Sequence, residues 1–127
     1  MSNSRKQLGT SLEKQVVAKA NQRPNLTATA QPLSGALYDF PADVVLTDAQ
    51  SRTLIECKVR AAHLTVKGEK HFTIDLHWIN KVRAEAVRDN ADAFAVALRA
   101  KGSSQIYALI DLDFLLDLLN NKKGKRR

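Results

Sequence analysis

The chain has 127 residues, of which 44% are hydrophobic and 26% charged, and this composition is typical of one soluble globular domain. No apolar run approaches the roughly 18 residues that a membrane span needs, and the first residues lack the apolar core of a signal peptide. We therefore expect a cytoplasmic protein that does not bind membranes. The only cysteine, Cys57, excludes an internal disulfide, and it is expected to pack rather than to act as a nucleophile.

The positive charge of the chain is unevenly distributed. A net charge of +7 and a pI near 9.8 favour a polyanionic partner. Five of the 20 basic residues lie in the last six positions, which leaves 15 basic against 13 acidic residues before them. The chain is therefore divided into a single domain over residues 1–121 and a basic tail over residues 122–127. The tail is expected to contact nucleic-acid phosphates through Lys122, Lys123, Lys125, Arg126 and Arg127.

The first predicted element is a helix over residues 4–22 with Ser4 as its N-cap. A polar loop follows over residues 25–40, and it turns at Ser34 and Gly35. A loop of this length tends to be functional or mobile. The helix prediction rests on apolar residues at helical spacing: Leu8, Leu12, Val16, Val17 and Ala20.

One side of this helix carries a stripe of three residues, Arg5, Gly9 and Glu13, at four-residue steps. A glycine inside a helix costs about 1 kcal/mol relative to alanine, and close approach of another backbone or of nucleic acid would explain it. On these residues alone, Glu13 can also be an exposed charge that pairs with Lys14 or Lys6.

Two apolar runs separated by residues 48–51 predict a β-hairpin. If Thr47 pairs with Arg52, Asp43 lies opposite Glu56, and directly opposed Cβ atoms lie about 4.5 to 5.5 Å apart. Because side chains alternate along a strand, Glu56 and the lysine two residues later share one face. The hairpin therefore brings two carboxylates and one amine together.

Two such carboxylates repel each other, so a proton or a divalent cation is expected between them. Oxygen ligands suit Mg²⁺ or Mn²⁺, and Asp43, Glu56 and the carbonyl of Cys57 would hold the ion, with Lys58 stabilising developing charge. The alternative is a solvated charged pair at the sheet surface. The apolar neighbours favour the catalytic interpretation, because an unpaired charge among them would cost roughly several kcal/mol.

These residues resemble a known family. The segments 41–43 (Pro-Ala-Asp) and 56–58 (Glu-Cys-Lys) look like the bipartite signature of the PD-(D/E)XK nucleases, with Ala42 as a small departure from it. The Arg-x-x-x-Gly-x-x-x-Glu stripe is similar to the opening of the archaeal-type Holliday junction resolvases. This resemblance implies that Glu13 joins the metal site and acts in catalysis, that Arg5 contacts a phosphate, and that Ser34 lies near the scissile phosphate. From the residues alone, Ser34 can equally be a turn residue.

Beyond the hairpin, residues 61–72 are expected to form an irregular, basic segment with Lys67 and Lys70, which are expected to clamp DNA or, alternatively, to be simply solvated. Asp75 is predicted to cap a helix over residues 76–90, and in the resembled family this helix faces DNA, so Lys81 is expected to contact the backbone. With Arg5, Lys6 completes the expected DNA contacts of the first helix. The core stripe of the later helix is predicted to be Ile79, Val82, Ala86 and Val87.

Strands over residues 94–99 and 106–110 and a leucine-rich helix over residues 112–120 complete the predicted elements. Together they predict an α/β fold with a small mixed β-sheet flanked by helices, like that of restriction endonucleases. The last helix carries more apolar residues than one face can bury, and with Trp78 it suggests a homodimer. The alternatives are that this helix closes the core of the monomer and that Trp78 lies in the core rather than in an interface.

The sequence is therefore interpreted as a Mg²⁺-dependent endonuclease that resolves four-way DNA junctions by phosphodiester hydrolysis. The resemblance implies a role in DNA recombination and repair, and the small size suits a phage product working in the host cytoplasm. One alternative is another nuclease of the superfamily, of the nicking or restriction type. Others are a non-catalytic nucleic-acid-binding module and a basic protein that binds RNA through its tail.

Overall fold

A computed structural model describes residues 3–31, 42–64 and 66–124, and it describes side chains within these ranges from residue 11 to residue 120. The described elements are, in chain order, α1 (Asn3–Asn21), β1 (Thr27–Ala30), β2 (Val44–Thr47), β3 (Arg52–Arg60), β4 (His63–Leu64), β5 (Lys70–His71), α2 (Leu76–Arg88), β6 (Ala93–Ala100), β7 (Ile106–Ile110) and α3 (Leu112–Gly124). None of these helices is long and apolar enough to cross a membrane.

Five of the described strands form a mixed sheet in the order β1-β2-β3-β6-β7. The first three strands are antiparallel neighbours, β3 and β6 run parallel through the α2 crossover, and β7 returns antiparallel to β6. A parallel pair needs such a crossover, usually a helix. The predicted α/β class with a small mixed sheet and flanking helices is confirmed.

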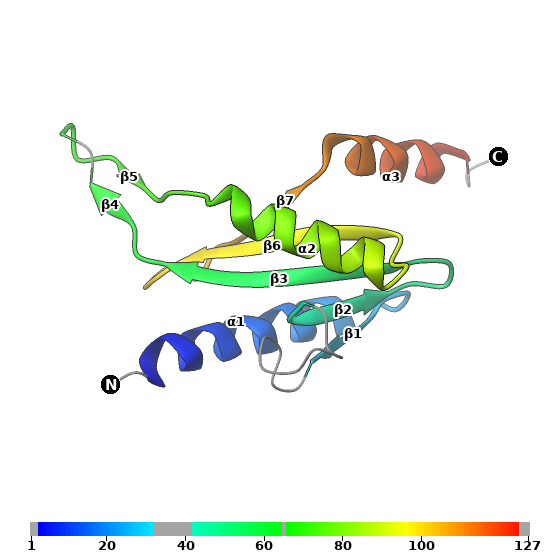
Figure 1. Ribbon diagram of the computed structural model, residues 1–127, viewed down its shortest axis with the longest axis horizontal. Coiled ribbons are helices and arrows are strands. Elements are labelled where there is room, and N and C mark those ends of the chain that lie inside the picture. Colours follow the sequence, from blue (N-terminus) through cyan, green and yellow to red (C-terminus); the bar gives the residue numbers. More distant parts are fainter. Residues whose placement is uncertain (1–2, 32–41, 65, 125–127) are drawn as a thin grey trace.

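The helices α1 and α2 cover opposite faces of the sheet (Figure 1). The side chains of β3 alternate between these faces, with Ile55 and Cys57 in the α1 core and Leu54 in the α2 core. The α2 core also contains Trp78, Val82 and Ala86. The predicted stripe of α2 was therefore wrong at Val87, which is 74% exposed, because the buried positions repeat every four residues from Trp78.

The segment predicted as a loop over residues 25–40 contains strand β1, which pairs with β2 from Thr27 opposite Thr47 to Ala30 opposite Val44. The loop prediction was wrong over these four residues. Only small alanines point inward along β1, so its apolar alternation is weak, and the edge pairing with β2 decides its structure. The rest of the predicted loop, including Ser34, lies outside the described residues.

Helix α2 begins where predicted, because the Asp75 side chain accepts a hydrogen bond from the backbone of His77 at 2.8 Å. It ends at Arg88, two residues before the predicted end, and Asn90 adopts a left-handed conformation with φ of 55°. Arg52 ties this end to β3 through an ion pair with Asp89 at 2.8 Å. The helix is thus fixed to the sheet at its C-terminal end.

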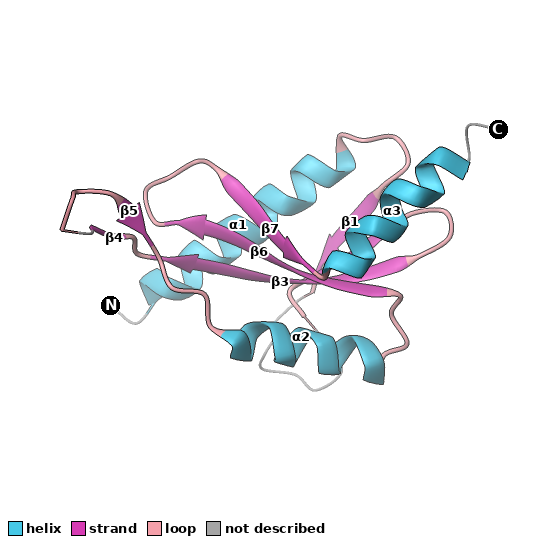
Figure 2. Ribbon diagram, turned by 90° about the horizontal axis from the view of Figure 1, so that it is seen from above, coloured by secondary structure: helices cyan, strands magenta, loops and turns pink. Residues whose placement is uncertain are grey.

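Helix α3 extends away from the sheet, on the opposite side from α1 (Figures 1 and 2). Its five leucines are between 39% and 65% exposed, as the predicted excess of apolar surface requires. Of the two places expected for Trp78, the core is confirmed, because Trp78 is 7% exposed and lies in the core under α2. Its expected contribution to an apolar dimer surface was therefore wrong.

The basic segment after β3 forms a two-stranded hairpin, β4–β5, that projects beyond the end of the sheet (Figures 1 and 2). It was expected to be irregular, and its strands are only two residues long each. This hairpin leaves β3 at the same end of the sheet at which α1 begins.

Candidate active site

The candidate site lies where β2 ends and β3 continues. Strand β2 pairs only with residues 52–55 of β3, and the described part of the chain provides no strand on this edge of residues 56–60. The ladder hydrogen bond at this point is made by a side chain, because the backbone of Cys57 donates to the Asp43 carboxylate at 2.7 Å. The carboxylate of Asp43 is therefore fixed against β3.

The predicted hairpin register is confirmed, since Thr47 lies opposite Arg52 and Val44 opposite Ile55. Asp43 itself lies just beyond this ladder, so the expected directly opposed pair with Glu56 is not formed as a regular strand pair. Ala42 explains the difference, because its φ of 60° turns the chain out of the extended conformation before β2. A positive φ at a buried alanine is uncommon, and such residues concentrate at functional sites.

Glu56 is the centre of the site and is only 2% exposed. Its Oε2 lies 3.3 Å from Nζ of Lys58 and 3.1 Å from Nζ of Lys81. Its Oε1 is buried and has no hydrogen-bond partner among the described residues. A buried carboxylate oxygen without a partner is costly, so this atom has an unused capacity to bind a cation or a proton.

Lys81 reaches Glu56 from α2, where it was expected to face DNA. Burial alone would lower the pKa of Lys81, but the charge of Glu56 and its hydrogen bond outweigh burial, so the pKa is raised. The Lys81 amine also lies 4.0 Å from Oε1 of Glu85, one turn further along the same helix. Lys81 is therefore part of the site, and its contact with DNA stays a prediction.

Trp78 lies beneath the basic residues of β3. The guanidinium carbon of Arg60 lies 4.9 Å from the centre of its ring, and Nζ of Lys58 lies 5.8 Å away. Cations at these distances are attracted to the face of an indole ring. Lys58 is thus held between Glu56 and Trp78, with its amine directed along the α2 face of the sheet.

Glu13 belongs electrostatically to the same site although it lies on α1. Burial, followed by the charges of Asp43 and Glu56, raises the pKa of Glu13 to about 7. Burial and then Asp43 also raise the pKa of Glu56, which the two lysines partly oppose. A region in which neighbouring carboxylates disfavour the ionisation of Glu13 and Glu56 stabilises added positive charge.

The thiol of Cys57 faces the α1 core rather than the lysines. Burial, followed by the charge of Asp43, raises its pKa well above the usual range. A thiol that stays protonated at neutral pH is a poor nucleophile, which supports the packing role expected for this residue.

The oxygen atoms of the candidate site meet the requirements of a hard divalent cation such as Mg²⁺ only in part. Within the described ranges, no cluster of three or more acidic, histidine or cysteine side chains is close enough to hold a metal ion. The fit rests instead on the buried, unpartnered Oε1 of Glu56, on the fixed carboxylate of Asp43 and on oxygen chemistry that Mg²⁺ and Mn²⁺ prefer. Asp43, Glu56 and the Cys57 carbonyl, with Glu13 as a fourth candidate, therefore stay predicted metal ligands.

The other predicted residues are placed less completely. Lys67 and Lys70 are exposed on the β4–β5 hairpin. Arg5 and Lys6 lie on α1 and Lys122 and Lys123 on α3, at positions where the structure describes the backbone only. Ser34, Pro41, Lys125, Arg126 and Arg127 lie outside the described residues.

Sequence reasoning missed two features of this site: the pairing of Lys81 with Glu56, and the stacking of Arg60 on Trp78. Helical spacing could have found the first one. If Trp78 instead of Val87 is taken as a core residue, Lys81 and Glu85 follow at three and seven residues, beside the buried stripe. No comparable sequence pattern indicates that Arg60 stacks on Trp78, because this contact depends on the strand register.

Comparisons with known proteins add one finding about the fold. The structure is similar to that of Hjc, a Holliday junction resolvase from Archaeoglobus fulgidus, solved at 1.6 Å resolution, with a TM-score of 0.58 and 18% sequence identity over 79% of this chain and 73% of the other. The two chains share a fold. No model of a protein family matches the sequence, and a search of curated proteins finds no significant match.

Proposed function

We propose that this protein is a metal-dependent DNA endonuclease that resolves four-way junctions by phosphodiester hydrolysis. The observation that carries the proposal is the convergence of Asp43, Glu56 and Lys58 at the open edge of β3, within a fold shared with a Holliday junction resolvase. A fold alone supports many functions, so the proposal depends on this constellation.

The chemistry follows from the positions of the side chains. When bound, Mg²⁺ or Mn²⁺ would lower the pKa of a water molecule and polarise the scissile phosphate. Asp43 and Glu56 would hold the ion, and the buried setting of Glu56 excludes water from its far side. Lys58 is placed to stabilise the negative charge that develops on the phosphate, because its amine lies beside Glu56 and is held there by Trp78.

The proposed substrate is branched double-stranded DNA. The exposed hairpin with Lys67 and Lys70 projects from the end of β3 and can reach a phosphate backbone, and the basic residues of α1 and of the tail supply further contacts. A junction must be cut in two strands, while each chain carries one candidate site, so we propose a homodimer. A phage origin and a place in the host cytoplasm stay part of this proposal.

A cleavage assay with two substrates tests the proposal. A synthetic four-way junction and a duplex of the same sequence are incubated with the protein, with and without Mg²⁺. We expect paired, symmetric cuts in the junction only, and only with the metal. Cutting of both substrates alike would favour another nuclease of the superfamily, and binding without cutting would favour a non-catalytic module.

Deletion of residues 122–127 provides the matched control for the basic tail. The truncated protein is expected to bind both substrates more weakly but to keep its preference for cutting the junction, because the deletion leaves Asp43, Glu56 and Lys58 unchanged. If the truncation abolishes all nucleic-acid binding and no cutting is ever seen, the protein is a tail-dependent binder instead.

A further inference from the structure

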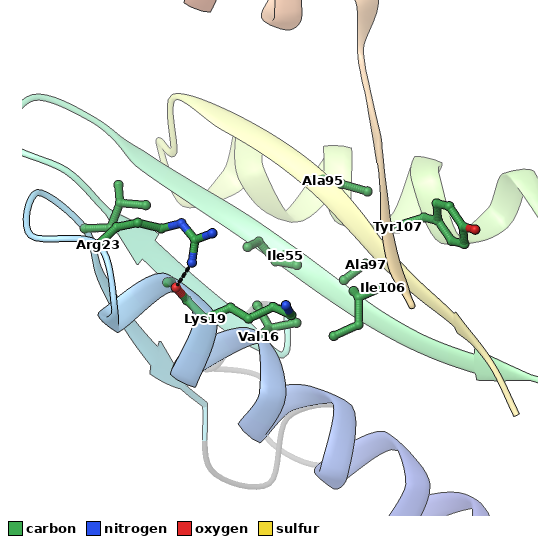
Figure 3. Close-up of a pocket in the computed structure, with 11 residues that line it drawn as sticks. Val16, Lys19, Arg23, Ile55, Ala95, Ala97, Ile106 and Tyr107 are labelled. Atoms are coloured by element: carbon green, nitrogen blue, oxygen red, sulfur yellow. Dashed lines mark hydrogen bonds between the residues drawn. The ribbon is translucent and has the colours of Figure 1, made fainter. Parts of the chain in front are cut away.

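An apolar groove lies on the α1 side of the sheet, away from the candidate active site. It has a volume of about 290 Å³ and lies between the second half of α1 and the outer strands β6 and β7. Figure 3 shows its floor, which includes Ile55, Ala97 and Ile106. Small alanines on β6 leave this space, because α1 packs mainly over β1, β2 and β3.

The rim of this groove is basic. Lys19 and Arg23 both line it, and the Arg23 guanidinium donates a hydrogen bond to the backbone carbonyl of Lys19, so the two side chains start from one place at the end of α1 (Figure 3). An apolar floor with two cations on its rim is complementary to an apolar helix that carries carboxylates along one border.

Helix α3 has this pattern. Leu112, Leu116 and Leu119 recur at helical spacing and are 51% to 65% exposed, so they form an apolar stripe that this copy leaves in solvent. Asp113 and Asp117 are exposed, and they follow each other one turn apart along the border of the stripe.

The groove and α3 of the same chain cannot meet. Helix α3 lies on the opposite side of the sheet from α1 (Figures 1 and 2), and Asp111 is the only residue between β7 and α3. Connections between strands and helices normally need at least two residues, so α3 could fold back across β7 only by unwinding its first turn. A second copy of the chain is free of this restriction.

We propose that α3 of one copy packs into the groove of a second copy, and that the second copy returns the same contact. This inference rests on the homodimer of the proposed function and assigns its interface. The leucine stripe fills the space between α1 and β7, while Asp113 and Asp117 face Lys19 and Arg23. The exchange is self-complementary, as a two-fold dimer requires, and it uses two such contacts to reach the area of a stable interface.

Two charge-reversal variants of the full-length protein test this exchange. The groove variant carries Lys19→Glu and Arg23→Glu, and the helix variant carries Asp113→Lys and Asp117→Lys. Each variant alone places like charges at both contacts of its own dimer, so its dissociation constant, measured by sedimentation, is expected to rise by at least about tenfold. A control with Lys14→Glu and Lys101→Glu has the charge change of the groove variant away from the groove, and it should dimerise like the wild type.

An equimolar mixture of the two variants gives the decisive result. In a mixed dimer the acidic helix meets a basic groove and the basic helix meets an acidic groove, so dimers with one copy of each variant should form with nearly wild-type affinity. Their formation also shows that both variants are folded. The proposal is overturned if the wild type stays monomeric at high micromolar concentration, if the reversals leave the dimer intact, or if mixing restores no dimer. These readouts use neither DNA nor metal, so the nuclease proposal is judged separately by junction cutting.

Discussion

The two faces of strand β3 differ sharply although their residues alternate along one backbone. Glu56 and Lys58 lie on the face toward α2, where Glu56 forms ion pairs with Lys58 and with Lys81 of α2. Toward α1, it presents Ile55 and Cys57, which pack in an apolar core. The comparison shows that the alternation of side chains along one strand places Glu56 and Lys58 on one face and Cys57 in the apolar core of the other.

The separation also explains how a small domain tolerates buried charge. On the α2 face, the charges of Lys81 and Lys58 favour the ionised form of Glu56 and so partly oppose the effect of burial, while Oε1 of Glu56 has no hydrogen-bond partner among the described residues. On the α1 face, in contrast, Ile55 and Cys57 pack among apolar side chains, while Glu13 on α1 is only partly buried. Burial of apolar side chains stabilises the fold, whereas burial of a charge costs free energy. Substitutions on the two faces should therefore affect different properties.

The largest expected effect is on the charged face. Glu56→Gln should lower single-turnover junction cleavage by at least about a thousandfold, because it removes the charge of a proposed metal ligand while keeping the shape of the side chain. Junction binding should stay equal or become tighter, since one negative charge facing the phosphates is lost. Glu85→Gln is the matched control, because it makes the same change away from β3 and should alter cleavage only a few-fold. Cleavage by the Glu56 variant near the wild-type rate would show that the site is misassigned.

The opposite result is expected for the next residue along the strand. Cys57→Ser should cost about 1–3 kcal/mol of unfolding free energy, because it places a hydroxyl in the apolar α1 core without a hydrogen-bond partner. Its cleavage rate at a temperature where it is folded should stay close to that of the wild type. Urea unfolding and cleavage assays measure the two quantities, and a large loss of activity in the folded variant would argue against the separation of the faces.

A smaller effect is expected from Lys81, which competes with any cation for Glu56. Lys81→Met keeps most of the side-chain volume but removes the positive charge 3.1 Å from Oε2 of Glu56, so Mn²⁺ should bind about three to ten times more tightly. Arg88→Met, on an exposed position of the same helix, is the control. Weaker Mn²⁺ binding by the Lys81 variant would mean that this lysine supports the metal site instead of competing with it.

The smallest effect concerns the pH dependence of folding. Because the pKa of Glu13 is raised from 4.5 to about 7, the folded state binds its proton more tightly than the unfolded state. This stabilisation is complete below about pH 4.5 and is lost as the pH rises toward 7. The Glu13→Gln variant has no carboxyl group at this position, so it does not lose folding stability in this way as the pH rises. Its melting temperature at pH 8 without metal should therefore exceed that of the wild type by about 3–6 °C, after allowance for solvent screening. The difference should shrink at pH 5, and an equal difference at both pH values would contradict the assignment.

Most of the fold could be predicted from the sequence, because the apolar runs and the helix caps clearly indicate where strands and helices lie. Asp75 marks the start of α2, and the hairpin register follows from a four-residue turn. Strand β1 was missed because its inward residues are small alanines, so that pairing with β2 rather than side-chain pattern decides its structure.

The candidate site was predictable only where it is local in sequence. Glu56 and Lys58 lie two residues apart, so strand alternation alone places them together. The hydrogen bond from the backbone of Cys57 to the Asp43 carboxylate, by contrast, depends on the left-handed turn at Ala42. No sequence pattern indicates such a turn at an alanine. The ion pair of Lys81 depends on which residues of α2 face the sheet, and this in turn depends on Trp78 being buried.

The central claim is that the charged face of β3 binds a divalent cation, and Mn²⁺ titration followed by electron paramagnetic resonance, without DNA, tests it most directly. We expect saturable binding to the wild type and a loss of that binding in the Glu56→Gln variant, with the Glu85→Gln variant binding as the wild type does. Absence of binding to the wild type, or equal binding to the Glu56→Gln variant, would contradict the account.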